Sequence, residues 1–322
     1  MHGARAESAL AVVHEQGPRG GAIVHRHAFE DNQLASVALG FEITAADGTR
    51  LALHAWPAPP GNGAGTGTGK PRGTVLLVPG LGEHIGRYER LAQWLRTRGW
   101  MVVGYDHRGH GRSGGKRGVL GLRTDLITDL ATVVDTTRPA NGTPLILLGH
   151  SMGGLLVAQF VAEEVRSVDA IVMSSPALGA DLTWWQRLQL ALSSLAPDLA
   201  IPNGFDPSCI SHDPAVVRAY RDDPLVHDRL SGRLVRALFD GGMRVLERAP
   251  QWSVPTLLMF SGSDRLVSEA GSATFAARAP AGVVEAHRYA ELFHEIFNEI
   301  ASAPVYATLE RWLDERFPPA LT

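Results

Sequence analysis

The sequence has few of the features that mark secreted, membrane-spanning and nucleic-acid-binding proteins. It contains a single cysteine, Cys209, so an internal disulfide is excluded and the chain fits a reducing compartment. No apolar run approaches the length of a membrane span, and the apolar stretch at residues 9–13 is too short for a signal peptide. The net charge is −3, and the basic residues are scattered along the chain. The sequence therefore shows no basic cluster of the kind that binds nucleic acid or an anionic membrane. We therefore expect a cytoplasmic protein without a nucleic-acid partner.

What the chain does contain is a regular alternation of apolar strands and amphipathic helices. Short apolar runs predict buried strands, and apolar residues three and four apart predict helices. The expected strands are residues 34–44, 50–56, 74–78, 100–105, 144–148, 170–174, 256–260 and 282–287, the first two forming a hairpin. The expected helices are residues 87–97, 122–137, 268–279 and 297–316. This order predicts an α/β fold with a mostly parallel central sheet and helices on both faces.

Two segments depart from the alternation and suggest the domain organisation. Residues 1–32 show no periodicity, and we expect a flexible N-terminal extension there. Residues 179–251 are helical in pattern, rich in Leu, Ala and Arg, and lie between two expected strands. We interpret them as a helical cap, or lid, inserted over the C-terminal edge of the sheet, where α/β folds place their sites. The core then consists of residues 33–178 and 252–322.

The stretch Gly149-His-Ser-Met-Gly153 lies between an apolar strand and an expected helix. A serine on a sharp strand-to-helix turn is a nucleophile elbow, and the flanking glycines leave room for the tight turn. The stretch Gly111-Arg-Ser-Gly-Gly115 has the same spacing, but no buried strand enters it and its glycines cannot start a stable helix. We therefore take Ser151 as the nucleophile and Ser113 as a loop residue.

A serine hydroxyl needs a histidine to accept its proton and a carboxylate to orient that histidine. In folds with a nucleophile elbow these partners follow the serine in the order acid, then histidine. Asp264 comes directly off an expected strand end, and His294 lies in the loop beyond the last strand, whereas His287 lies within that strand. Chain order and strand-end placement predict a catalytic triad of Ser151, Asp264 and His294.

The tetrahedral intermediate of acyl transfer needs two backbone N–H donors. One is expected from the residue after the nucleophile, Met152, and the other from the loop after the early strand. Pro79-Gly-Leu-Gly82 is that loop, so the second donor is expected to be Leu81.

Several motifs together resemble one family. They are Gly80-Leu-Gly-Glu-His-Ile-Gly-Arg-Tyr88, Asp106-His-Arg-Gly-His-Gly-Arg-Ser113, Gly149-His-Ser-Met-Gly-Gly154, Gly262-Ser-Asp-Arg-Leu266 and His294, with Asp206-Pro-Ser-Cys-Ile-Ser211 and Asp223-Pro-Leu-Val226 in the cap. From about residue 38 to 315 the chain resembles the monoacylglycerol lipases and their lysophospholipase-like bacterial relatives, which have the α/β-hydrolase fold. The resemblance implies the same triad and the same oxyanion donors.

The resemblance also implies a polar pocket that receives glycerol, formed with the help of Glu83 and Arg87. Taken alone, these two residues at i, i+4 would read as a surface helix pair. The chain departs from the family at Pro79, where members usually have histidine, and at Phe297, where a polar residue often lines the glycerol exit. Both departures concern the recognition of glycerol rather than ester hydrolysis.

Together these patterns predict a serine hydrolase that cleaves carboxylic esters of lipids, foremost monoacylglycerols, through an acyl-serine intermediate. The alternatives are a lysophospholipase, a general short- or medium-chain carboxylesterase, and a ligand-binding receptor on the same scaffold. We expect no cofactor and no metal, because His107 and His110 have no third ligand at suitable spacing and are read as loop-structuring residues.

The cap offers one candidate for contact with a lipid surface. Leu188, Leu192 and Leu195 recur on one helical face, with Trp184 and Trp185 beside it. The apolar surface exceeds what one buried face needs, which suits a helix that docks on lipid and makes the protein peripheral at membranes. The alternative is that both tryptophans fill the core of the cap.

Overall fold

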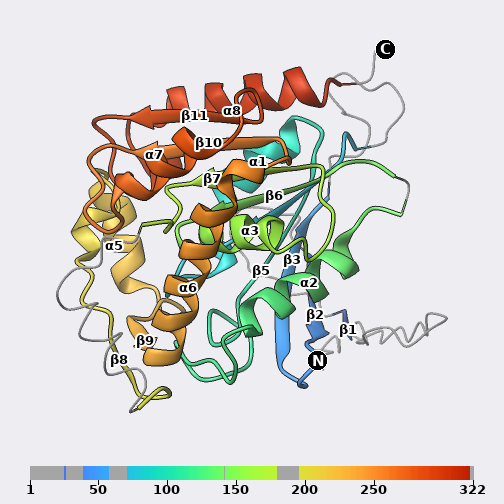
Figure 1. Ribbon diagram of the computed structural model, residues 1–322. Coiled ribbons are helices and arrows are strands. Elements are labelled where there is room, and N and C mark those ends of the chain that lie inside the picture. The colour runs from blue at the N-terminus through green and yellow to red at the C-terminus, as the bar shows by residue number, and fades with distance from the viewer. Residues whose placement is uncertain (1–24, 27–38, 58–70, 141, 180–195, 320–322) are drawn as a thin grey trace, which may run out of the picture.

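The computed structural model describes residues 25–26, 39–57, 71–140, 142–179 and 196–319 (Figure 1). Its centre is a nine-stranded sheet with the order β1-β2-β3-β5-β4-β6-β7-β10-β11. These strands are β1 (His25–Arg26), β2 (Leu39–Thr44), β3 (Arg50–Trp56), β4 (Thr74–Val78), β5 (Met101–Tyr105), β6 (Leu145–His150), β7 (Ala170–Ser174), β10 (Thr256–Ser261) and β11 (Val284–Tyr289). Strands β1, β2, β3 and β5 pair antiparallel in that order, and every neighbouring pair from β5 to β11 is parallel. The mostly parallel sheet predicted from the sequence is confirmed.

The middle strands are buried on both faces, which is why they read as unbroken apolar runs. All residues of β4, β6, β7 and β10 are buried. Since side chains alternate along a strand, Leu77 packs in one apolar cluster and Leu76 in the other. The carboxyl ends of these parallel strands point to one edge of the sheet, so the loops after β4, β6, β10 and β11 meet there.

Helices cover both faces of the sheet. On one face the core contains residues of α1 (Glu89–Thr97) and α8 (Ala303–Arg316). On the other face it contains residues of α2 (Asp125–Thr137), α3 (Met152–Ala162), α6 (Gly232–Arg248) and α7 (Glu269–Arg278). Two short 3₁₀ helices, η1 (Ile85–Tyr88) and η4 (Ile296–Asn298), lie beside the C-terminal edge of the sheet.

The segment between β7 and β10 holds smaller elements besides α6. They are β8 (Ala200–Pro202), η2 (Pro207–Cys209), α5 (Pro214–Asp222), β9 (Arg229–Ser231) and η3 (Ala249–Gln251), with β8 and β9 paired in a separate sheet. Helix α6 packs on α3, in front of it in Figure 1, and its buried residues belong to the core of the sheet. The expected insertion comprises residues 179–251. Its C-terminal part, which contains α6, therefore also covers the sheet.

Parts of the expected organisation lie outside the described residues. Strand β1 falls within the expected extension, where His25 pairs with Glu42, and the rest of residues 1–32 is not described. Trp184 and Trp185 also lie outside the described residues. Among the helices that are described, none is long and apolar enough to cross a membrane.

Candidate active site

Ser151 lies on the turn that joins β6 to α3. Its backbone has φ 53° and ψ −117°, a conformation that a residue with a side chain rarely adopts. A Cβ on Gly149 would collide with the carbonyl of Gly153, and one on Gly153 would collide with the carbonyl of Val78. The two glycines therefore allow strand, turn and helix to pack closely, and the strained turn presents the serine at the sheet edge.

Asp264 and His294 come from the loops after β10 and β11. The Nδ1 atom of His294 lies 2.6 Å from Oδ2 of Asp264, and both side chains are almost wholly buried. The other carboxylate oxygen, Oδ1, accepts the amides of Leu266 and Val267 at 2.9 Å each. The carboxylate is thus fixed by its own loop and holds the imidazole in one orientation.

The electrostatics of this pair favour the charged forms of both groups. Burial alone would raise the pKa of Asp264 and lower that of His294. The attraction and hydrogen bond between them outweigh burial, so the pKa of Asp264 is lowered and the pKa of His294 is raised. A histidine whose imidazolium is stabilised by a fixed carboxylate is suited to accept and return a proton.

Ser151 and His294 line the same cavity, which has a volume of about 140 Å³. Leu81 and Met152, the two expected oxyanion donors, line it as well. Most of the other residues that line this cavity are apolar. They include Ala177, Phe205, Leu230, Val235, Leu238, Phe239, Leu266 and Val267. The structure thus brings the expected nucleophile, the expected base and both expected oxyanion donors to one largely apolar cavity.

The loop that carries Leu81 is held at three backbone groups. Nε2 of His107 lies 3.0 Å from the carbonyl oxygen of Pro79, and Oε1 of Glu83 accepts the amide of Gly80 at 2.6 Å. Gly82, at φ 80°, accepts the amide of His227 on its carbonyl at 2.8 Å. The departure at Pro79 leaves the loop supported, because the hydrogen bond at this position uses the backbone carbonyl.

Glu83 and Arg87 are buried rather than on the surface, with side chains 5% and 10% exposed. They form an ion pair at 2.6 Å, and Arg87 also grips Glu295 through both terminal nitrogens at 2.8 and 2.9 Å. With Phe297 they line a separate cavity of about 20 Å³ next to the one that holds Ser151. Phe297 itself is buried and packs edge-on against Tyr306.

Two residues of this region were missed from the sequence. Glu295 follows His294 directly and is buried against Arg87. His150, just before Ser151, is buried with its ring centre 4.7 Å from that of His294, and its Nδ1 lies 3.2 Å from Oγ of Ser174. Their position beside the two catalytic candidates was the only sequence signal.

The remaining candidates have structural partners. Oγ of Ser113 donates to the carbonyl of Asp106 at 2.6 Å and accepts the amide of Ala52 at 2.8 Å, so its reading as a loop residue is confirmed. His110 is bound through Nδ1 to the carbonyl of Arg108 at 2.9 Å. In the described part of the chain no group of three or more His, Cys, Asp or Glu residues could hold a metal ion.

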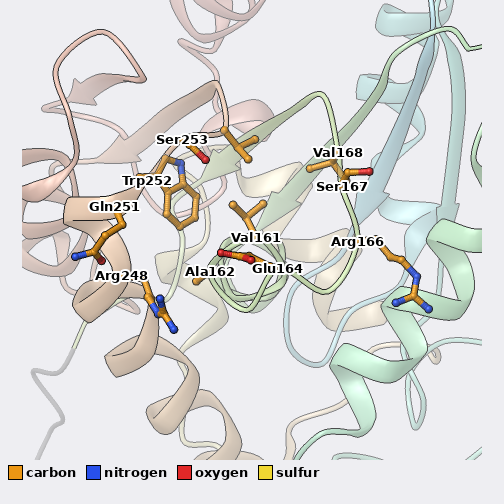
Figure 2. Close-up of a pocket in the computed structure, with 11 residues that line it drawn as sticks. Val161, Ala162, Glu164, Arg166, Ser167, Val168, Arg248, Gln251, Trp252 and Ser253 are labelled. Carbon is orange, nitrogen blue, oxygen red and sulfur yellow. The ribbon is translucent and has the colours of Figure 1, made fainter.

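A larger cavity of about 380 Å³ lies beyond the C-terminal end of α3 (Figure 2). Val161 and Ala162 line its floor beside the ring of Trp252, while Arg166 points away and pairs with Asp135. The described residues that line it include two serines but no histidine. We therefore place the chemistry at the smaller cavity with Ser151.

Comparison with known proteins agrees with this geometry. Residues 69–301 match the family described as Hydrolase_4, serine aminopeptidase, S33. The chain is 37% identical to a monoacylglycerol lipase of Mycolicibacterium smegmatis, covering 76% of this chain and 88% of that protein. It is 30% identical to a phospholipase of Bacillus subtilis, covering 76% of this chain and 96% of that protein.

Solved structures give the same picture. The crystal structure of the Paleococcus ferrophilus monoacylglycerol lipase superimposes with a TM-score of 0.73 at 30% identity, covering 83% of this chain and 99% of that one. A soluble variant of the Saccharomyces cerevisiae monoglyceride lipase, in complex with a substrate analog, has the same fold, with a TM-score of 0.76 at 24% identity over 84% of this chain and 93% of that one. With an elbow serine beside a carboxylate-bound histidine on a mostly parallel sheet, the chain belongs to the Hydrolase_4 family of α/β-hydrolases.

Proposed function

We propose that this protein hydrolyses carboxylic esters of lipids, with monoacylglycerols as the preferred substrates and fatty acid and glycerol as products. The observation that carries the proposal is that Ser151 and the Asp264-bound His294 line one apolar cavity. Such a cavity suits an acyl chain, and the relatives named monoacylglycerol lipase support glycerol as the alcohol.

In the acylation step, Nε2 of His294 takes the proton from Oγ of Ser151 as the oxygen attacks the ester carbonyl. The carbonyl oxygen becomes negatively charged and accepts hydrogen bonds from the backbone amides of Leu81 and Met152. The tetrahedral intermediate collapses when His294 donates the proton to the departing alcohol oxygen, which leaves an acyl-serine. Asp264 stabilises the transient imidazolium throughout.

Deacylation repeats these steps with water. His294 takes a proton from a water molecule as its oxygen attacks the acyl carbon, and the same two amides donate hydrogen bonds to the oxyanion. Oγ of Ser151 then leaves, recovers the proton from His294, and the fatty acid is released. No cofactor enters either half of the reaction.

The alcohol side of the site is proposed to border Glu83, Arg87 and Phe297. They line the small cavity next to the catalytic one, together with His150 and Asn298. Since Glu83 and Arg87 hold each other and other protein groups, they shape this side through the loops that they support.

The cap is proposed to be residues 179–251, with α6 as its base on the core. Its residues Phe205, Leu230 and Leu238 line the cavity, so this segment contributes directly to the acyl-binding wall. Contact with a lipid surface is proposed for Trp184 and Trp185, which would make the protein peripheral at membranes.

A lysophospholipase is the second candidate, favoured by the similarity to the Bacillus subtilis phospholipase. The test is a panel of monoacylglycerols, lysophospholipids and p-nitrophenyl esters of matched acyl length, ranked by kcat/KM. We expect the monoacylglycerols to rank first. A higher kcat/KM for lysophospholipids would favour the lysophospholipase instead. The absence of any product burst from a p-nitrophenyl ester would favour a ligand-binding receptor.

A further inference from the structure

A chain of three buried charges connects the two loops that carry the chemistry. We call Glu83, Arg87 and Glu295 the charge triad. Their side chains are 5%, 10% and 6% exposed, and the guanidinium lies between the two carboxylates. Glu83 belongs to the loop after β4, and Glu295 to the loop after β11, so the triad spans a sequence separation of more than 200 residues.

One end of the triad holds the oxyanion loop. Oε1 of Glu83 accepts the amide of Gly80 and the hydroxyl of Tyr88, each at 2.6 Å. A Cβ on Gly80 would lie 2.7 Å from this carboxylate oxygen and 3.3 Å from Cβ of Ser151, so the carboxylate contacts the loop beside the nucleophile. The carboxylate thus fixes the amide of the residue immediately before the expected donor Leu81.

The other end holds the histidine loop. Both carboxylate oxygens of Glu295 accept from Arg87, and Oε2 also accepts Nδ2 of Asn298 at 2.8 Å. The amide of Glu295 donates to the carbonyl of Ile210 at 2.8 Å. The residue immediately before it is His294, so the position of the imidazole follows the position of Glu295.

We propose that Glu83, Arg87 and Glu295 are positioning residues, which fix the oxyanion loop relative to His294. The proposal rests on the proposed ester hydrolysis at Ser151. It gives Glu83 and Arg87 a role in the chemistry of every ester substrate, whatever its alcohol. Since the guanidinium is planar and grips Glu295 with two parallel hydrogen bonds, it defines direction as well as distance.

The energetics of burial support a role beyond stability. Three charges are removed from water here, and a buried ion pair is often no more stabilising than apolar residues of the same volume. Burial would raise the pKa of Glu83, but Arg87, His150 and the hydrogen bonds from Tyr88 and Gly80 lower it to about 2. The carboxylate of Glu83 therefore stays charged.

The carboxylates of the triad also act on His294. The groups that face the imidazole are Asp264, Glu295 and Glu83, which favour its protonated form, and His150, whose ring lies 4.7 Å away. Asp264 has the largest favourable effect, and the two carboxylates of the triad add to it. Removing either triad charge should therefore lower the pKa of the histidine.

The test uses Glu295→Gln and Glu83→Gln, which keep the side-chain shape, and Arg87→Lys, which keeps the charge but loses the planar grip. With p-nitrophenyl butyrate we expect each variant to lower kcat by about 10- to 100-fold with KM little changed, as for a misplacement of catalytic groups by a fraction of an ångström. The same loss is expected with a monoacylglycerol. The acidic limb of the kcat/KM profile, which reports the free histidine, should move to lower pH in the two Gln variants and stay in place in Arg87→Lys.

Asp129→Asn is the matched control. Asp129 forms a buried pair with Arg108 through two hydrogen bonds of 2.6 and 2.7 Å, and neither residue lines the two cavities of the site. This control variant should have a lower melting temperature, with kcat and the acidic limb of the kcat/KM profile unchanged.

Three outcomes bear on the proposal. If the variants of the charge triad lose activity only toward the monoacylglycerol, the proposal is overturned in favour of direct glycerol recognition. If the kcat/KM pH profiles are unchanged, or if all three variants of the charge triad fail to fold, the role of these residues is structural only. If the wild type hydrolyses p-nitrophenyl butyrate but no monoacylglycerol, the proposed substrate fails while this comparison still stands.

Discussion

At the scale of single residues, backbone conformation separates the two serines that share the G-x-S-x-G spacing. Ser151 has a positive φ between a buried strand and a helix, with its side chain at a cavity. Ser113 lies in a loop, and its hydroxyl is occupied by two backbone groups. The strain at Ser151 is compatible with a nucleophile held at the sheet edge.

Substitution of these serines should have opposite effects. Ser151→Ala is expected to lower kcat by at least about 10³-fold and to abolish labelling by a fluorophosphonate probe, because no other group can form the acyl intermediate. Ser113→Ala should leave both intact but lower the free energy of unfolding by about 1–2 kcal/mol, since two backbone groups lose their partner. Labelling that persists in Ser151→Ala would show that the nucleophile lies elsewhere.

The histidine assignment can be tested in the same way. His294 is buried and bound to Asp264, whereas His287 lies in β11, partly exposed, with Nε2 at 2.7 Å from Glu285. His294→Ala should lower kcat by several powers of ten, with a residual rate from the oxyanion donors. His287→Ala should retain near-wild-type kcat, and the reverse result would contradict the assignment.

The catalytic triad of Ser151, Asp264 and His294 could be proposed from the sequence, because the positions of these residues follow from the topology. In a parallel sheet the carboxyl ends of all strands lie at the same edge. A serine, an aspartate and a histidine that follow three such strands are therefore expected to converge. The role of Glu295 could not be predicted, because its partner Arg87 comes from the other end of the chain. For the same reason the spacing of Glu83 and Arg87 could not distinguish a surface pair from a buried one.

At the scale of elements, strands were predicted more accurately than helix starts. Strands β4 and β7 have the predicted bounds, because burial on both faces gives unbroken apolar runs. The predicted start of the last helix at residue 297 is wrong, since α8 begins at Ala303 and residues 296–298 form a 3₁₀ turn. The buried side chain of Phe297 continued the apolar pattern without belonging to the helix.

Periodicity alone could not predict how helix α6 of the expected cap packs. The amphipathic pattern of α6 indicates a helix with one apolar face, but not which neighbour that face covers. In the structure the face packs on α3 and joins the main core, while Val235, Leu238 and Phe239 line the cavity. A single helix thus contacts both the core of the sheet and the cavity that Ser151 lines.

The proposed lipid contact of the cap gives an element-scale prediction. Trp184→Ala combined with Trp185→Ala is expected to weaken binding to lipid vesicles and to slow hydrolysis of aggregated long-chain monoacylglycerol. Hydrolysis of a soluble short-chain ester should change little, because a soluble ester needs no contact with a lipid surface. If the double variant melts several degrees lower and loses both activities together, the tryptophans are core residues and the docking proposal fails.

At the scale of the whole molecule, the buried histidines link stability to pH. Burial, the largest effect, together with repulsion by neighbouring charged groups lowers the pKa of His107 and His110 to about 3 and of His150 and His227 to about 4. In the unfolded chain these residues titrate near pH 6.5. Between these values the unfolded state binds protons that the folded state does not, so stability falls as pH falls.

We therefore predict a steep acid transition. Below about pH 6.5 each of the four histidines can contribute about 1.4 kcal/mol per pH unit, which gives an upper limit of about 5 kcal/mol per unit down to about pH 4. His294, whose pKa is raised, is protonated in both states over this range and adds no slope. The measurement is the urea midpoint from about pH 8 to about pH 4.5. His110→Gln should reduce the slope by up to about 1.4 kcal/mol per pH unit, the contribution of one proton. A midpoint that stays constant down to about pH 5 would mean that these histidines are hydrated and charge freely in the folded state.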